Sequence, residues 1–79
     1  MKDERKYKNN NPVANPITMR GASNLIRGKL VYDFHFVEND AGDIIGKAVM
    51  FYERDKPEEK ARRWTLLILD DGSLLIAEW

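Results

Sequence analysis

The segment WTLLILDDGSLLIAEW, residues 64–79, decides the fold of this chain. Its Asp71-Gly72 pair stands between two apolar runs, which is a strong signal of a β-hairpin. We predict a two-residue turn closed by Asp70 and Ser73. In this register one face of the hairpin carries Trp64, Leu66, Ile68, Leu75, Ala77 and Trp79, and the other carries Thr65, Leu67, Leu69, Leu74 and Ile76.

Both faces of this predicted hairpin are apolar, whereas a hairpin in a one-sheet monomer normally turns a polar face to water. We therefore expect the second face to be covered by barrel closure, by another segment of the chain or by a second protein chain. The alternation does not decide which face is internal. The predicted partner-binding residues are therefore either Leu67, Leu69, Leu74 and Ile76, or Trp64 and Trp79.

A second hairpin is predicted upstream, because residues 29–37 alternate at the period of a half-buried strand. The turn sequence NDAGD, residues 39–43, predicts a three-residue loop with Gly42 at positive φ, followed by a strand over residues 44–53. This loop would pair Phe34 with Ala48, Phe36 with Gly46 and His35 with Lys47.

The segments outside the hairpins give weaker signals. Residues 54–63, RDKPEEKARR, predict one or two helical turns, with Asp55 as cap, Pro57 in the first turn and Glu58 three residues after Asp55. Residues 22–27 fit a bent strand better than one helical turn capped by Ser23. The polar residues 1–16 lack periodicity and predict a flexible arm, which leaves residues 17–79 as a single β domain.

Together these elements predict a mainly β fold. We expect a small antiparallel meander of four to five strands, curled as a barrel or half-barrel, with one short helix between the two hairpins. A chain of 79 residues without cysteine has neither a large core nor a disulfide to stabilise it. Self-association would supply additional burial.

Composition restricts the compartment and the chemistry. The chain has no cysteine and one histidine, and no signal peptide or long apolar stretch stands out, so we expect a cytoplasmic protein without metal or cofactor. His35 with Asp33 and Lys47 forms a conceivable polar trio, but a lone histidine in an alternating strand is typical of an exposed surface position. A small enzyme subunit that uses His35 is accordingly the least favoured alternative, and we predict no catalytic activity.

Nucleic-acid binding is the stronger alternative, because small β-barrels hold single strands with basic rims and exposed aromatic side chains. The basic arm and one further basic pair would supply the contacts, through Lys2, Arg5, Lys6, Tyr7, Lys8, Arg62 and Arg63. The formal net charge of zero argues against a general affinity for polyanions.

The sequence favours protein recognition, because the last hairpin carries more apolar surface than one sheet face requires. We predict a non-catalytic protein-binding module that pairs with another protein chain, as a homodimer or with a different partner. Very small chains without catalytic residues are often stoichiometric regulators or inhibitors, such as those of phages and mobile elements.

Overall fold

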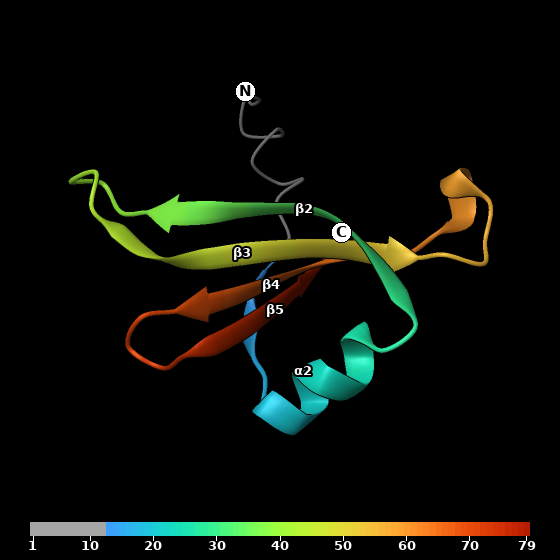
Figure 1. Ribbon diagram of the computed structural model, residues 1–79, viewed down its shortest axis with the longest axis horizontal. Coiled ribbons are helices and arrows are strands. Elements are labelled where there is room, and N and C mark those ends of the chain that lie inside the picture. The colour runs from blue at the N-terminus through green and yellow to red at the C-terminus, as the bar shows by residue number, and fades with distance from the viewer. Residues whose placement is uncertain (1–12) are drawn as a thin grey trace.

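The computed structural model describes residues 13–79, which form one antiparallel sheet with a helix packed on one side (Figure 1). The elements are β1 (Asn15–Pro16), α2 (Met19–Ile26), β2 (Lys29–Glu38), β3 (Ile44–Glu53), the 3₁₀ turn η1 (Glu58–Lys60), β4 (Arg63–Leu69) and β5 (Leu74–Glu78). The strand order is β1-β5-β4-β3-β2, so β2 is an edge strand and the sheet is open. The predicted mainly β meander is confirmed.

Helix α2 corrects the prediction of a bent strand for residues 22–27, because residues 22–26 are helical and Arg27 is the C-cap of the helix. Its N-cap is Thr18, whose Oγ1 accepts a hydrogen bond from the N–H of Gly21 at 2.9 Å, and not Ser23. Ala22, Leu25 and Ile26 recur at helical spacing and pack against the sheet. This amphipathic face, together with the Thr18 cap, favours the helix over an extended segment.

Strand β1 lies within the segment that the sequence predicted as an arm. Asn15 pairs with Ile76 and Pro16 with Leu75, and the N–H of Ile17 donates to the carbonyl of Leu74 at 3.1 Å. These bonds extend the sheet by a short edge strand, which leads directly into α2.

The β2–β3 hairpin has the predicted three-residue loop, since the N–H of Asn39 donates to the carbonyl of Asp43 and Gly42 has φ +86°. The predicted register is wrong from Tyr32 to Val37, because an irregularity between Val31 and Asp33 leaves Tyr32 without a partner on β3. Phe34 is consequently opposite Val49, Phe36 opposite Lys47 and His35 opposite Ala48. The extra residue moves the following side chains of β2, up to Val37, to the other face of the sheet. A second irregularity between Val37 and Glu38 restores the predicted register, with Glu38 opposite Ile44.

The β4–β5 hairpin also has a three-residue loop, which corrects the predicted two-residue turn. The N–H of Leu69 donates to the carbonyl of Ser73, the N–H of Ser73 donates to Asp71 Oδ1, and Gly72 has φ +95°. Glycine at the third loop position allows a type I turn followed by a bulge, as in the first hairpin. The register therefore shifts by one residue, and Leu66 is opposite Ile76 instead of Ala77.

The connection between the hairpins contains the predicted helical turn in its shortest form. It is the single 3₁₀ turn η1, and Pro57 occupies the cap position in place of the predicted Asp55. The N–H of Arg62 then donates to Glu53 Oε1 at 3.1 Å, which joins the end of the connection to the end of β3.

The core lies between α2 and one end of the sheet. Phe51 is fully buried and stacks on Trp64 with ring centroids 5.6 Å apart, and Ala22 and Leu66 complete the buried cluster. Lys29 Nζ lies 5.2 Å from the Trp64 ring centroid and Arg62 Cζ lies 5.0 Å from it. No helix within residues 13–79 has the length and apolar character that crossing a membrane requires.

Candidate functional site

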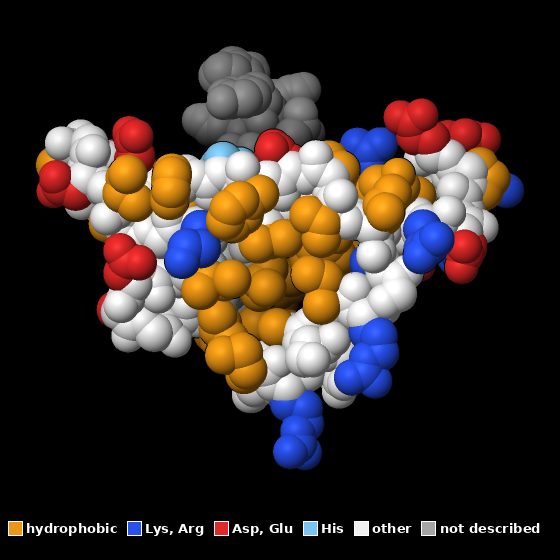
Figure 2. Space-filling view, in the orientation of Figure 1, with side chains coloured by type: hydrophobic (Ala, Val, Ile, Leu, Met, Phe, Trp, Pro, Cys, Tyr) orange, Lys and Arg blue, Asp and Glu red, His pale blue; other side chains and the backbone are white. Residues whose placement is uncertain are grey.

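The face of the sheet beside α2 carries apolar side chains that the helix covers only in part. Figure 2 shows hydrophobic side chains gathered in a hollow at the centre of this face. The strand registers and the burial of these residues assign them to four strands. We call this surface the apolar hollow and define it by Phe34, Phe36, Val49, Ile68, Leu74 and Ile76.

The apolar hollow is continuous with the core and open to water. Val49, Ile68 and Ile76 pack against the buried cluster on one side. Phe34 and Phe36 are 59% and 61% exposed, which is unusual for two phenylalanines on one strand. Burying a phenylalanine side chain fully contributes about 1.5–3 kcal/mol, so this surface has considerable free energy to gain from being covered.

Helix α2 borders this face with another exposed apolar residue. Met19 precedes Ala22 and Ile26 by three and seven residues, so it lies on the same side of the helix, and it is 72% exposed. The helix is too short to shield the whole width of the sheet. Its first turn therefore adds to the exposed apolar surface.

The structure divides the predicted partner-binding residues between four environments. Leu74 and Ile76 lie in the apolar hollow, whereas Leu67 and Leu69 point to the opposite face of the sheet. Trp64 is buried in the core, and Trp79 is half exposed with its Nε1 donating to Thr65 Oγ1 at 2.6 Å. The four aliphatic residues do not share a face, because the last hairpin is closed by three loop residues and not by two.

Sequence reasoning missed Phe34, Phe36, Val49 and Ile68 as site residues. The predicted register placed both phenylalanines opposite small residues, where they would have been packed. The irregularity at Tyr32 has no clear sequence signal, although Tyr32 gains an edge-to-face contact with Tyr52 at a centroid distance of 5.5 Å. This contact accompanies the bulge and becomes visible only in three dimensions.

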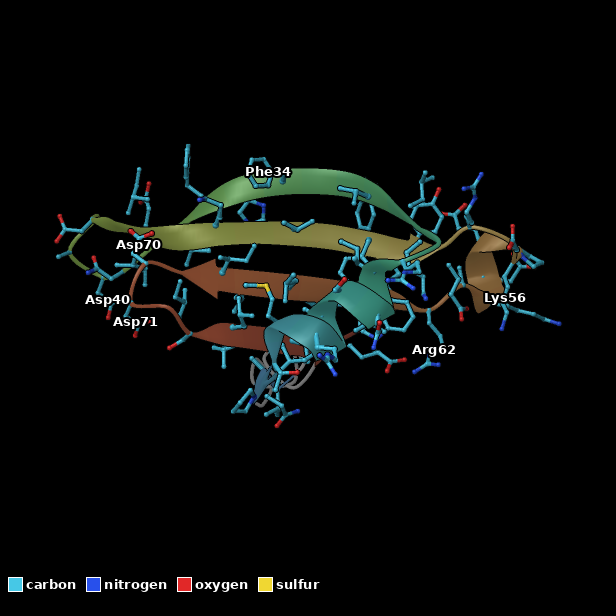
Figure 3. All side chains as sticks on the ribbon, turned by 60° about the horizontal axis from the view of Figure 1, so that its bottom comes forward. Phe34, Asp40, Lys56, Arg62, Asp70 and Asp71 are labelled. Carbon is cyan, nitrogen blue, oxygen red and sulfur yellow. The ribbon has the colours of Figure 1, made fainter. Side chains whose placement is uncertain are left out.

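Charges are distributed unevenly around the sheet. Residues 13–32 contain Arg20, Arg27 and Lys29 and no acidic residue. The two hairpin loops lie together at one end of the sheet (Figure 3). Within residues 38–46 and 69–74 all charged side chains are acidic, and we call this end the acidic tip: Glu38, Asp40, Asp43, Asp70 and Asp71.

The two arginines of the predicted nucleic-acid surface are engaged in ion pairs. Arg62 forms a two-bond pair with Glu78, with Nε–Oε2 and Nη2–Oε1 distances of 2.6 and 2.8 Å. This pair lowers the pKa of Glu78 and raises that of Arg62. Arg63 Nη2 lies 3.5 Å from Glu58 Oε2. The other predicted contacts, Lys2, Arg5, Lys6, Tyr7 and Lys8, lie outside the described residues.

The predicted polar trio around His35 does not form. His35 Nδ1 lies 3.7 Å from Asp33 Oδ2 and both side chains are about half exposed, but Lys47 points to the other face of the sheet. Asp33 has a structural contact instead, since its Oδ1 accepts a hydrogen bond from the N–H of Phe34 at 2.8 Å. This bond satisfies a backbone donor on an edge strand.

An open depression of about 440 Å³ lies at the end of the sheet opposite the acidic tip. It is lined by aromatic and charged side chains, namely Tyr32, Tyr52, Arg54, Lys56, Glu58 and Arg63. Two of its cations are near carboxylates, because Lys56 lies 3.6 Å from Glu53 and Arg63 is paired with Glu58. Among residues 13–79, no three His, Asp or Glu side chains are grouped as metal ligands would be.

Comparison with known proteins adds no functional information, because no family model, curated protein or solved structure matches the chain.

Proposed function

We propose that this protein is a non-catalytic protein-binding module that buries an apolar segment of another protein in the apolar hollow. The observation that supports the proposal is the exposure of Phe34 and Phe36. They lie beside three partly buried residues that pack against the core, namely Val49, Ile68 and Ile76. Large apolar patches on small domains are typical of interaction surfaces. Aromatic side chains at the centre of such patches contribute a large share of binding energy.

In this proposal the module acts by occupying its partner, since the contacts are apolar side chains together with Lys47, which lies opposite Phe36 and Ile68 on the same face. Stoichiometric regulation or inhibition of the partner follows from that mode of action. The absence of cysteine favours the cytoplasm as the proposed location, because small domains of oxidising compartments commonly rely on disulfides.

The experiment is affinity capture from a lysate of the source organism with the tagged full-length chain and its Met19→Asp variant. Met19 is 72% exposed on the helix that borders the apolar hollow, so the substitution places a charge beside the binding surface with little effect on the fold. We expect a stoichiometric partner to be captured by the wild type and to be reduced at least tenfold with Met19→Asp.

Val13→Asp is the matched control, because Val13 is 77% exposed and precedes β1. This variant should capture the same partner as the wild type. Equal loss in both variants, or equal retention in both, would contradict binding at the helix side of the sheet.

Nucleic-acid binding is a second candidate, favoured by one observation. The depression at the end of the sheet combines the Tyr32–Tyr52 pair with Arg54 and Arg63, and aromatic faces beside cations suit a stacked base and its phosphate. Titration with a labelled single-stranded oligonucleotide at low and high salt tests it. Salt-sensitive binding that is lost in Tyr52→Ala would support this function, and an absence of binding at low salt would exclude it.

A further inference from the structure

Strand β2 is a long edge strand with an unusual concentration of exposed apolar side chains. It has ten residues, its only neighbour in the described sheet is β3, and no strand within residues 13–79 pairs with its other side. Of the nine large hydrophobic residues that are exposed among residues 13–79, five belong to this strand: Leu30, Val31, Tyr32, Phe34 and Phe36. An open edge with apolar side chains is the arrangement through which sheets pair with another chain.

The two ends of β2 carry opposite charge. The strand begins at Lys29, two residues after Arg27, in a part of the chain without acidic residues. It ends at Glu38, the first residue of the acidic tip. Figure 3 shows Asp40, Asp70 and Asp71 together at the end of the sheet where β2 ends, whereas Lys56 and Arg62 at the other end are paired with Glu53 and Glu78.

We propose that β2 pairs antiparallel with β2 of a second copy of this chain, which forms a twofold-symmetric dimer with a continuous sheet. An antiparallel arrangement places the basic start of each strand beside the acidic end of its copy, so the charges of the edge are self-complementary. A parallel arrangement would place like charges together. This inference rests on the proposed function, because it uses the Phe34 and Phe36 side of the same apolar hollow.

The backbone of β2 is suited to this pairing near its centre. The N–H of Phe34 donates to Asp33 Oδ1 and is therefore directed to the open side of the strand. In the dimer this N–H exchanges the Asp33 carboxylate for a carbonyl of the second copy. In the isolated chain the Asp33 carboxylate caps the edge, which limits pairing with unrelated strands.

The dimer would join the two apolar hollows along their Phe34 and Phe36 sides. Both phenylalanines lie on the helix side of the sheet, beside the junction between the copies. Their exposed rings would contact those of the second copy, and the combined surface would be twice as wide as that of one chain. A partner protein could still dock on the helix side of this surface, because pairing at the edge covers neither Met19 nor β5.

Sedimentation of the full chain over a wide concentration range tests the dimer. The wild type should sediment as a dimer, and Phe36→Lys should raise the dissociation constant at least tenfold. Phe36 is 61% exposed, so circular dichroism of the variant should match the wild type. Val13→Lys is the control at a distance from β2, and it should remain dimeric.

A charge exchange tests the antiparallel orientation. Arg27→Glu and Asp40→Lys each place like charges opposite each other in their own homodimers, so each variant should dimerise more weakly than the wild type. An equimolar mixture restores opposite charges at both contacts of a heterodimer and should dimerise more strongly than either variant alone. This comparison does not use Phe36→Lys, so it tests the dimer even if that substitution disturbs folding.

A wild type that sediments as a monomer at all concentrations would overturn the proposal, as would a Phe36→Lys variant that folds and remains dimeric. A mixture no stronger than its components would exclude the antiparallel orientation. Met19→Asp separates this inference from the proposed function, because it should lose the partner and keep the dimer. If the wild type is monomeric but still captures a partner, the dimer is excluded and the proposed function is not affected.

Discussion

At the scale of single residues, the cap of α2 is the clearest test of the observed local structure. Thr18→Ala removes the acceptor of the Gly21 N–H, and we expect a loss of about 1 kcal/mol in the free energy of unfolding. Ser23→Ala is the matched control, because Ser23 lies inside the helix and alanine has the higher helix propensity. Urea denaturation of both variants measures the difference. Equal stabilities, or a greater loss in Ser23→Ala, would contradict the observed cap.

Gly46 shows that a single residue can be required for the pairing of two strands although the local sequence gives no signal of this requirement. A Cβ at this position would lie 2.5 Å from the carbonyl oxygen of Ile68 and 2.8 Å from Leu69 Cα, so only glycine allows β3 and β4 to approach here. In the sequence Gly46 is an isolated glycine within an apolar strand. Its role depends on the neighbouring strand, and local reasoning has no access to that neighbour.

At the scale of elements, hairpins and loops were more predictable than helices and registers. Both hairpins were predicted from apolar runs around Asp and Gly, and the first loop was also predicted at the correct length. The second register was wrong because an Asp71-Gly72 pair fits both a two-residue turn and the last two positions of a three-residue loop. Residues 22–27 were predicted as a bent strand in preference to a helical turn, whereas the cap at Thr18 and the spacing of Ala22 and Ile26 favour a helix.

The candidate site was less predictable than the fold, because its residues depend on the strand registers. The prediction that the sheet carries excess apolar surface depended only on composition and alternation, and apolar side chains do lie on both of its faces. The identity of the exposed residues depended on two registers, and each register contained a one-residue error. Leu74 and Ile76 lie in the apolar hollow even so, while Phe34 and Phe36 came from a strand that the sequence had assigned to the packed interior.

The ion pair between Arg62, which precedes β4, and Glu78 at the end of β5 makes the free energy of unfolding depend on pH. The hydrogen bonds from Arg62 lower the pKa of Glu78 in the folded state below its unfolded value of about 4.3. The stabilisation is therefore complete above that value and is lost as the pH falls through the lower, folded pKa. Urea denaturation should show wild type more stable than Glu78→Gln at pH 7, with the gap closing in acid. A gap that widens in acid would contradict this ion pair.

At the scale of the whole molecule, the small core and the open sheet edge both favour association with a second copy of the chain. The buried cluster lies at one end of the sheet, and the chain has no disulfide to compensate for its size. A dimer through β2 would add burial where the described chain has least. Stability would then depend on protein concentration, because association contributes to the folded state only when a second copy is present.

This dependence can be measured in thermal unfolding. If the dimer unfolds in one step, a tenfold increase in concentration adds about 1.4 kcal/mol per dimer, and an unfolding entropy of about 2.1 cal/mol/K per residue converts this into a rise in Tm of about 4 °C. We expect this rise in the wild type and in Val13→Lys. Phe36→Lys should have a lower Tm than the wild type at equal concentration, since its weaker association contributes less to the folded state. A constant Tm in the wild type would mean that β2 remains unpaired when the protein unfolds, and that the core between α2 and the sheet is sufficient for stability without a second copy.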